Sequence, residues 1–195
     1  MLVFWEQRLV ILAPPKTGST ALAAALSAKS ALQFQRPPVL KHTTVRRFHR
    51  FIGPYLETAS GEKFEVAALM REPIDWLASW YRFRSRDDVE PAKSTKGLTF
   101  DEFVRAYTLE NQPAYAAVGA QSQFLQPRNG QGVDYLYRYE DMPSFVDFLE
   151  NKLNINIQLS HLNISPPIEA VLSLETRKIA RHTLHAEFSL YDSIR

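Results

Sequence analysis

One short stretch near the start of the chain holds residue types that bind a phosphate or sulfate group. The segment Pro15-Lys16-Thr17-Gly18-Ser19-Thr20 lies between an apolar run, Leu9–Leu12, and an Ala/Leu-rich run, Ala21–Leu26. The first run predicts a buried strand and the second predicts a helix. A turn between them gathers backbone N–H groups at the positive end of the helix, which stabilises an anion. The candidate anion-binding residues are Lys16, Thr17, Gly18, Ser19 and Thr20. The alternative is an ordinary strand-to-helix connection with a solvated lysine.

A second basic group follows the clearest strand pattern in the chain. Arg71 comes directly after the apolar run Phe64–Met70, and a helix is predicted over Ile74–Arg84. An arginine at this point can hold a phosphate through two parallel hydrogen bonds, and Ser79 adds a hydroxyl donor from the helix. The alternatives are a surface ion pair between Arg71 and Glu72, and simple helix packing for Ser79.

A third basic group, Lys41-His42, lies in a predicted loop just before another helix. This helix spans about Val45–Ile52 and carries its arginines on the polar face. We expect His49, on that same face, to be solvated. Gly53-Pro54 mark a break in the surface region that follows.

The remaining segments alternate between strand and helix patterns. The run Val133–Tyr139 is a predicted strand, Met142–Leu153 is amphipathic, Thr99–Glu102 forms a capping box, and a last helix spans about Ile168–Leu184. This order predicts an α/β fold with a mostly parallel sheet flanked by helices, in a single domain over residues 1–195. Ligands collect at the carboxyl ends of the strands in such a sheet. We therefore expect three groups to converge on one cleft: Lys16, Lys41-His42 and Arg71.

The two phosphate motifs resemble those of sulfotransferases that use 3′-phosphoadenosine 5′-phosphosulfate (PAPS). Pro15–Thr20 resembles the loop that binds the 5′-phosphosulfate, in the form found in carbohydrate-type members. Arg71-Glu72-Pro73, followed by Ser79-Trp80-Tyr81, resembles the motif that binds the 3′-phosphate. Less specific segments are similar to bacterial members of the uronyl 2-O-sulfotransferase-like branch: Gln121–Leu125, Tyr139–Asp141, His161–Ser165 and Phe188–Tyr191. The resemblance touches most of the chain and implies a P-loop-kinase-like, three-layer α/β fold.

The resemblance also implies an activity and roles for the matched residues. A sulfuryl group would move from PAPS to an acceptor hydroxyl, on a carbohydrate by analogy with this branch. Backbone N–H groups from Thr17 to Thr20 would hold the 5′ end of the donor. Lys16 would neutralise the charge that grows on the bridging oxygen as the S–O bond breaks. Arg71 and Ser79 would hold the 3′-phosphate.

An attacking hydroxyl must lose its proton, which requires a general base with a pKa near neutral. His42 is the candidate, because the branch uses a histidine in this region and the neighbouring Lys41 would lower the pKa of the imidazole. Glu72 is the rival base, and a surface loop histidine without a catalytic role is the alternative. Lys41 and Arg46 are the candidate contacts for the acceptor.

The composition limits the class of protein. The chain has 195 residues, 45% of them hydrophobic, and its 23 basic and 21 acidic residues give a net charge of +2, which argues against a dedicated nucleic-acid binder. Without cysteine there are no disulfides or thiolate metal sites, and no apolar run is long enough for a membrane span. We expect a cytoplasmic enzyme that uses PAPS and no metal. Its partners are a small-molecule or glycan acceptor and, because the chain is short for this family, a second copy in a homo-oligomer.

Two other functions fit part of the pattern. A P-loop nucleotide kinase needs Gly-Lys-Ser/Thr after an earlier glycine, whereas Lys16 precedes Gly18 and the strand over 64–70 ends in an arginine rather than a Mg²⁺-binding carboxylate. A non-catalytic homologue that binds the spent nucleotide would keep both phosphate motifs. His42 distinguishes such a homologue from an enzyme.

Overall fold

The computed structural model describes residues 1–126, 130–159 and 168–194. These residues form two compact units. The first comprises residues 1–71, 121–126, 130–159 and 194, and the second comprises 72–120 and 168–193. The prediction of a single domain over residues 1–195 stays a prediction. The family-like segment His161–Ser165 lies outside the described residues.

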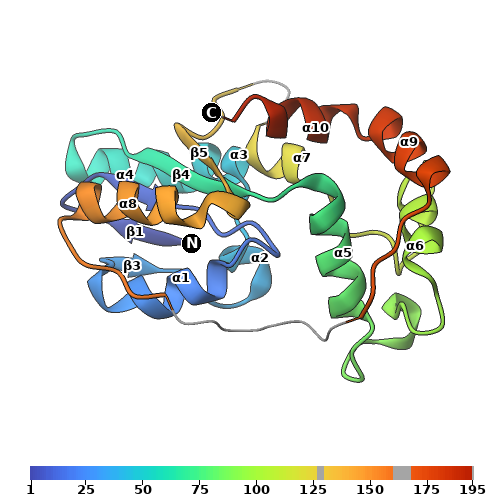
Figure 1. Cartoon of the computed structure of the whole chain (residues 1–195). Coiled ribbons are helices and arrows are strands. Elements are labelled where there is room, and N and C mark those ends of the chain that lie inside the picture. The colour runs from blue at the N-terminus through green and yellow to red at the C-terminus, as the bar shows by residue number, and fades with distance from the viewer. Residues whose placement is uncertain (127–129, 160–167, 195) are drawn as a thin grey trace. The chain divides into compact units, whose positions relative to one another are not determined.

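The first unit is built on an open five-stranded sheet in the order β3-β1-β2-β4-β5 (Figure 1). The strands are β1 (Leu2–Phe4), β2 (Leu9–Ile11), β3 (Leu32–Gln33), β4 (Glu65–Met70) and β5 (Tyr135–Arg138). β2, β4 and β5 run parallel, whereas β1 pairs antiparallel with both β2 and β3. The predicted α/β class is confirmed, but the sheet is mixed rather than mostly parallel. The physical reason is the short turn over residues 5–8, because a parallel pair needs a crossover of a dozen residues or more.

Helices cover the sheet of the first unit. They are α1 (Ser19–Leu26), η1 (Ser27–Lys29), α2 (Pro38–Lys41), α3 (Val45–Arg47), η2 (Phe48–Ile52), α4 (Gly53–Ser60), α7 (Gln121–Leu125), η4 (Tyr139–Asp141) and α8 (Met142–Leu153). Leu22 and Leu26 of α1 share one apolar core with Phe145 and Leu149 of α8, so both helices pack on the same face of the sheet. Side chains that point to the opposite face of the sheet are also fully buried, so both faces of the sheet are covered. These residues are Val3, Val10 and Val66.

The helical stretch that begins at Val45 is longer than the sequence predicts. α3, the π-helical turn η2 and α4 follow one another without a break as far as Ser60. Gly53-Pro54, where the sequence indicates a break, form the first turn of α4 instead. Proline is tolerated there because the first N–H groups of a helix have no partner inside it.

The second unit is helical, with α5 (Pro73–Arg84), η3 (Pro91–Lys93), α6 (Phe100–Tyr107), α9 (Leu174–Thr183) and α10 (His185–Asp192). Its core gathers aromatic side chains such as Trp76, Tyr81 and Phe103. The capping box of Thr99 and Glu102 is confirmed at the start of α6. The last predicted helix begins later than expected, because Ser173 caps α9 by accepting from the N–H of Thr176 at 3.1 Å.

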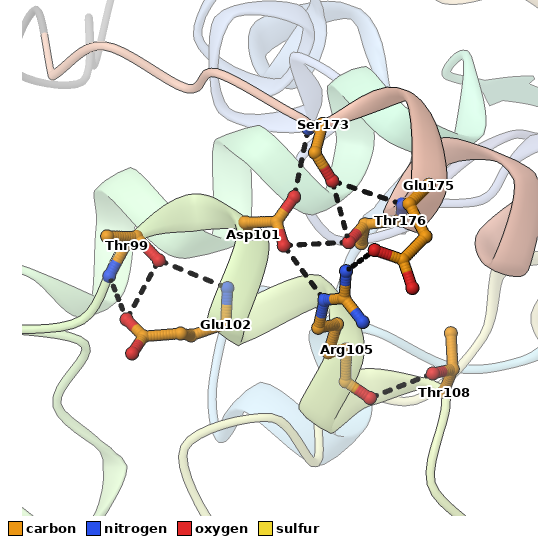
Figure 2. Close-up of polar contacts among 8 residues, drawn as sticks. All are labelled: Thr99, Asp101, Glu102, Arg105, Thr108, Ser173, Glu175 and Thr176. Atoms are coloured by element: carbon orange, nitrogen blue, oxygen red, sulfur yellow. Dashed lines mark hydrogen bonds and ion pairs between the residues drawn. The ribbon is translucent and has the colours of Figure 1, made fainter.

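A polar cluster around Asp101 joins α6 to the start of α9 within this unit (Figure 2). Asp101 accepts from Arg105 Nε at 2.9 Å, from Thr176 Oγ1 at 2.7 Å and from the backbone N–H of Ser173 at 2.9 Å. Arg105 also donates to Glu175 at 2.9 Å. We call these five residues the Asp101 cluster.

Among the helices that the structure describes, none is long and apolar enough to cross a membrane.

Candidate functional site

The candidate site lies in the first unit, at the edge of the sheet where the parallel strands end. The loop over residues 12–18 follows β2, Arg71 follows β4, and Tyr139 follows β5. Neighbouring parallel strands bring their carboxyl ends to the same edge of a sheet, where ligands collect in α/β folds. The loop over residues 12–18, Arg71 and Tyr139 therefore lie at the same edge of the sheet.

The loop over residues 12–18, which we call the Lys16 loop, has a left-handed backbone at two positions. Lys16 has a φ of 68° and Gly18 a φ of 72°. A Cβ atom on Gly18 would lie 3.2 Å from Cε2 of Tyr139 and 3.3 Å from Cε of Met142, so the loop needs glycine for its conformation and for this close approach. The left-handed conformation costs a non-glycine residue about 1 kcal/mol. The fold holds Lys16 in that conformation nonetheless.

The hydroxyl residues of the loop have different contacts. Thr17 is buried, and its Oγ1 donates to the carbonyl oxygen of Pro14 at 2.9 Å, so this side chain closes the turn. Ser19 and Thr20 open α1, and Thr20 Oγ1 accepts from Lys41 Nζ at 3.4 Å. Gly18 is the N-cap residue of α1 and has no side chain that could accept from the first N–H groups of the helix. These N–H groups are well suited to a bound anion.

Arg71 is attached to the same loop. Its Nη1 donates to the carbonyl oxygen of Lys16 at 3.3 Å, and its guanidinium carbon lies 4.6 Å from the centre of the Tyr139 ring. Gln121 binds the backbone of Arg71 on both sides: its Oε1 accepts from the N–H at 3.0 Å and its Nε2 donates to the carbonyl at 2.8 Å. Gln121 is only 2% exposed, so this two-point contact is shielded from water. The arginine is thus fixed at its backbone and along its side chain.

His42 is bonded to the segment that leads into the loop. Its Nδ1 lies 2.6 Å from the carbonyl oxygen of Ala13. Because a carbonyl only accepts, Nδ1 must carry the proton, which leaves the lone pair on Nε2 available to accept a proton. Burial lowers the pKa of His42 and the charge of Lys41 lowers it further, while the bond to Ala13 raises it by less than their sum. The imidazole is therefore neutral near pH 7 and has the tautomer of a base.

Lys41 and His42 lie at the end of a short helix, not in the loop that the sequence predicts. Lys41 is the last residue of the one-turn helix α2, which Pro38 begins, and His42 follows directly as its C-cap. Arg46 is exposed on α3. The prediction that His49 is solvated is wrong: its side chain is half-buried, with Nε2 3.1 Å from the carbonyl oxygen of Gly132.

Ser79 and Glu72 belong to the second unit. Ser79 lies on α5 and is buried. Glu72 precedes α5 and caps it, with Oε2 accepting from the N–H of Asp75 at 2.7 Å. This helix-capping contact gives the Glu72 carboxylate a structural role. Neither residue is among those that the first unit brings to the Lys16 loop.

The structure thus joins the three predicted groups at one loop. Arg71 contacts Lys16, Lys41 contacts Thr20, and His42 contacts Ala13. From the sequence, Tyr139 and Gln121 are named only within segments that resemble the family, and neither residue has a predicted role at this loop. Tyr139 lies at the end of a predicted strand, so the rule that placed Arg71 could have assigned it to the site, whereas no local pattern marks Gln121 as a partner of a backbone 50 residues away.

This arrangement can hold an anion between cationic groups and backbone N–H groups, and can take a proton from a neighbouring hydroxyl. Within residues 1–126, 130–159 and 168–194, no group of three or more histidines and carboxylates could hold a metal ion. A scan against protein-family models finds no match to this chain, and a search of the curated proteins finds no similar sequence.

Proposed function

We propose that the chain is a PAPS-dependent sulfotransferase of the family that its motifs resemble, with the P-loop-kinase-like fold that this family shares. The observation that carries the proposal is the hydrogen bond from Arg71 Nη1 to the carbonyl oxygen of Lys16. It joins the two motifs that the resemblance assigns to the two anionic ends of the donor. Each motif alone fits many proteins, but one bound nucleotide requires both at the same edge of the sheet, and their contact supports this.

The transfer would proceed in one displacement. The acceptor oxygen attacks sulfur, the S–O bond to the bridging oxygen breaks, and the electron pair of that bond stays on the phosphate of the product, 3′-phosphoadenosine 5′-phosphate (PAP). His42 Nε2 takes the proton of the acceptor hydroxyl. Lys16 and the N–H groups of Thr17 to Thr20 neutralise the charge on the leaving oxygen, which is the largest electrostatic demand of the reaction. Arg71 holds the 3′-phosphate, and the hydroxyl of Ser79 is proposed to donate a hydrogen bond to the same phosphate.

Several parts of the proposal rest on the resemblance alone. A carbohydrate hydroxyl is the acceptor that the branch suggests, with Lys41 and Arg46 as its contacts. A cytoplasmic location and a homo-oligomer belong to the same proposal.

Nucleotide binding tests the proposal directly. Calorimetry should detect PAP binding, and Lys16→Ala and Arg71→Ala should each weaken it about ten- to hundredfold, as expected for lost hydrogen bonds to a charged group. Lys29→Ala and Arg47→Ala are matched controls, because both side chains are exposed and neither lies on the loop. Tight binding of ATP–Mg²⁺ without binding of PAP would favour a nucleotide kinase and reject the proposal. PAP binding without transfer to any of a set of glycans, lipids and phenols would favour the non-catalytic homologue.

A further inference from the structure

The first unit contains a cavity of about 310 Å³ beside the Lys16 loop. Its walls come from β1, β2, α1 and the segment between Gln33 and Lys41. Pockets for small organic ligands range from about 300 to 1,000 Å³. The cavity therefore fits one small molecule.

The cavity exists because α1 presents small side chains to it. Thr20, Ala23, Ala24 and Ser27 line it at helical spacing, on one side of α1. Larger apolar side chains also line the cavity: Leu2, Ile11, Leu12, Leu22 and Phe34. The apolar part of a ligand would contact these side chains.

The two charged side chains of the cavity are both positive. Arg36 and Lys41 line it, whereas none of the described residues in its wall carries a carboxylate. The other polar groups are hydroxyls of α1 and the exposed amides Gln33 and Gln35. An anionic group on the ligand would complement this charge.

The cavity also borders the segment that holds the candidate base. Ala13 lines the cavity, and its carbonyl oxygen accepts from His42 Nδ1. Lys41 lines it as well and precedes His42 in the chain, and Ser19 and Thr20 line it at the start of α1. A ligand in the cavity therefore lies beside the residues whose N–H groups would hold the 5′ end of the donor.

The segment that contributes Arg36 and Lys41 also exposes apolar side chains. Val39 and Leu40 lie between these two lining residues in the chain, and they are 54% and 43% exposed. A sugar hydroxyl that faced the apolar part of the cavity wall would be left without a hydrogen bond, which weakens binding.

We infer that this cavity is the acceptor site, and that the acceptor is a small alcohol or phenol with an apolar body and an anionic group, not a polysaccharide. The apolar body contacts the apolar lining residues, the anionic group contacts Arg36 and Lys41, and the hydroxyl faces the start of α1, where Ser19 and Thr20 line the cavity. This inference rests on the proposed function, because it names the acceptor of that reaction. It differs from the resemblance, which favours a carbohydrate.

The test uses a fluorescent probe of this chemistry, 6-hydroxy-2-naphthoate, titrated against the full chain with PAP present. Saturable binding is expected, with no comparable binding of a uronic acid disaccharide. Arg36→Ala should weaken probe binding about three- to tenfold through the loss of a partly exposed charge-assisted hydrogen bond. Ala23→Phe should weaken it more than about tenfold by filling the cavity. With PAPS in place of PAP, the probe should be sulfated.

Two matched control variants show whether an effect on probe affinity depends on residues of the cavity wall. Arg47→Ala and Ala28→Phe change exposed residues of the same types outside the cavity wall, and both should leave probe affinity within about twofold of wild type. A melting curve for Ala23→Phe shows whether this variant folds, and Arg36→Ala, at an exposed position, tests the inference independently of it.

Several outcomes would overturn the inference. Stronger binding of the disaccharide, a loss of probe affinity in Arg46→Ala but not in Arg36→Ala, or displacement of the probe by PAP would each place the acceptor elsewhere. If PAP binds and the probe does not, the acceptor inference fails and the proposed function stands. If PAP itself does not bind, the proposed function fails, and the acceptor inference fails with it.

Discussion

The Asp101 cluster of the second unit and the Lys16 loop of the first unit use similar residue types for different purposes. In the Asp101 cluster, one arginine lies between two carboxylates, and hydroxyl and N–H groups satisfy the remaining oxygens of Asp101 (Figure 2). Opposite charges meet at the surface of the second unit. Such a cluster joins two helices and has no need of a ligand.

The Lys16 loop uses its charged groups differently. Arg71 Nη1 donates to the backbone carbonyl of Lys16, and Lys41 Nζ donates to the hydroxyl of Thr20. These contacts bring cationic side chains beside the N–H groups that begin α1, and this combination suits a bound anion. The comparison shows that an arginine held between carboxylates serves a structural contact, whereas cations beside the start of a helix suit a binding site.

Replacing the candidate base should give the largest effect at the Lys16 loop. His42→Ala should lower the rate of sulfuryl transfer by about 10²–10⁴, the usual contribution of general base catalysis, and leave PAP affinity unchanged. In wild type the rate should fall as the pH drops through the pKa of His42, because only the neutral imidazole accepts a proton. Since that pKa is lowered from 6.5, more than half of the maximal rate should persist at pH 6.5. A rate that is halved above pH 6.5, or an unchanged rate in His42→Ala, would contradict this role.

Removing the lysine charge should give the next largest effect. Lys16→Ala should lower the transfer rate by about 10²–10³, as expected when one stabilising group is removed from the developing charge. Lys29→Ala, an exposed lysine of the same unit, should leave the rate unchanged. Equal rates in Lys16→Ala and Lys29→Ala would show that the loop is an ordinary connection. Steady-state rates with saturating PAPS provide the measurement.

Local patterns in the sequence predicted the elements that local interactions determine. The strand before Arg71, the helix over Met142–Leu153 and the capping box at Thr99 all lie where the sequence placed them. Each depends on the apolar period or on a cap within a few residues. Their positions at the strand ends were enough to anticipate that Lys16 and Arg71 would meet.

Contacts between segments that are distant in the chain could not be predicted from local sequence patterns. The partner of His42 is a backbone carbonyl, which any residue type at position 13 would supply, so no sequence pattern could reveal it. The same holds for Gln121, whose amide contacts the backbone of Arg71. The antiparallel pairing of β3 with β1 is a further example, because β3 is a two-residue strand too short to show a period.

The backbone contact of Gln121 provides a smaller and more specific test of the Lys16 loop. Gln121→Leu removes both hydrogen bonds to Arg71 while keeping a side chain of similar size, and should weaken PAP binding about tenfold because Arg71 loses its fixed position. Gln123→Leu on the same helix is the control, since Gln123 is exposed. Calorimetry with PAP measures both variants. If they bind equally well, the position of Arg71 does not depend on Gln121.

The Asp101 cluster should give the smallest effect on the Lys16 loop and a clear effect on stability. Asp101→Asn should leave PAP affinity and transfer unchanged but lower the free energy of unfolding by about 2 kcal/mol, because several hydrogen bonds to a charged group are weakened. Asp88→Asn, in an exposed pair with Arg86, should cost almost nothing.

The pH dependence of the free energy of unfolding tests the charge of Asp101 itself. Burial raises the pKa of Asp101, but hydrogen bonds from Thr176, Arg105 and Ser173 outweigh burial and hold that pKa below its usual value of 3.8. A depressed pKa means that the carboxylate stabilises the fold fully above the unfolded-state pKa, and that this stabilisation is lost as the pH falls toward the folded-state pKa. The difference in unfolding free energy between wild type and Asp101→Asn should therefore be largest near neutral pH and should begin to shrink below about pH 4. A difference that stays constant across this range would mean that the cluster depends on shape rather than on charge, and the contrast with the Lys16 loop would then lose its electrostatic basis.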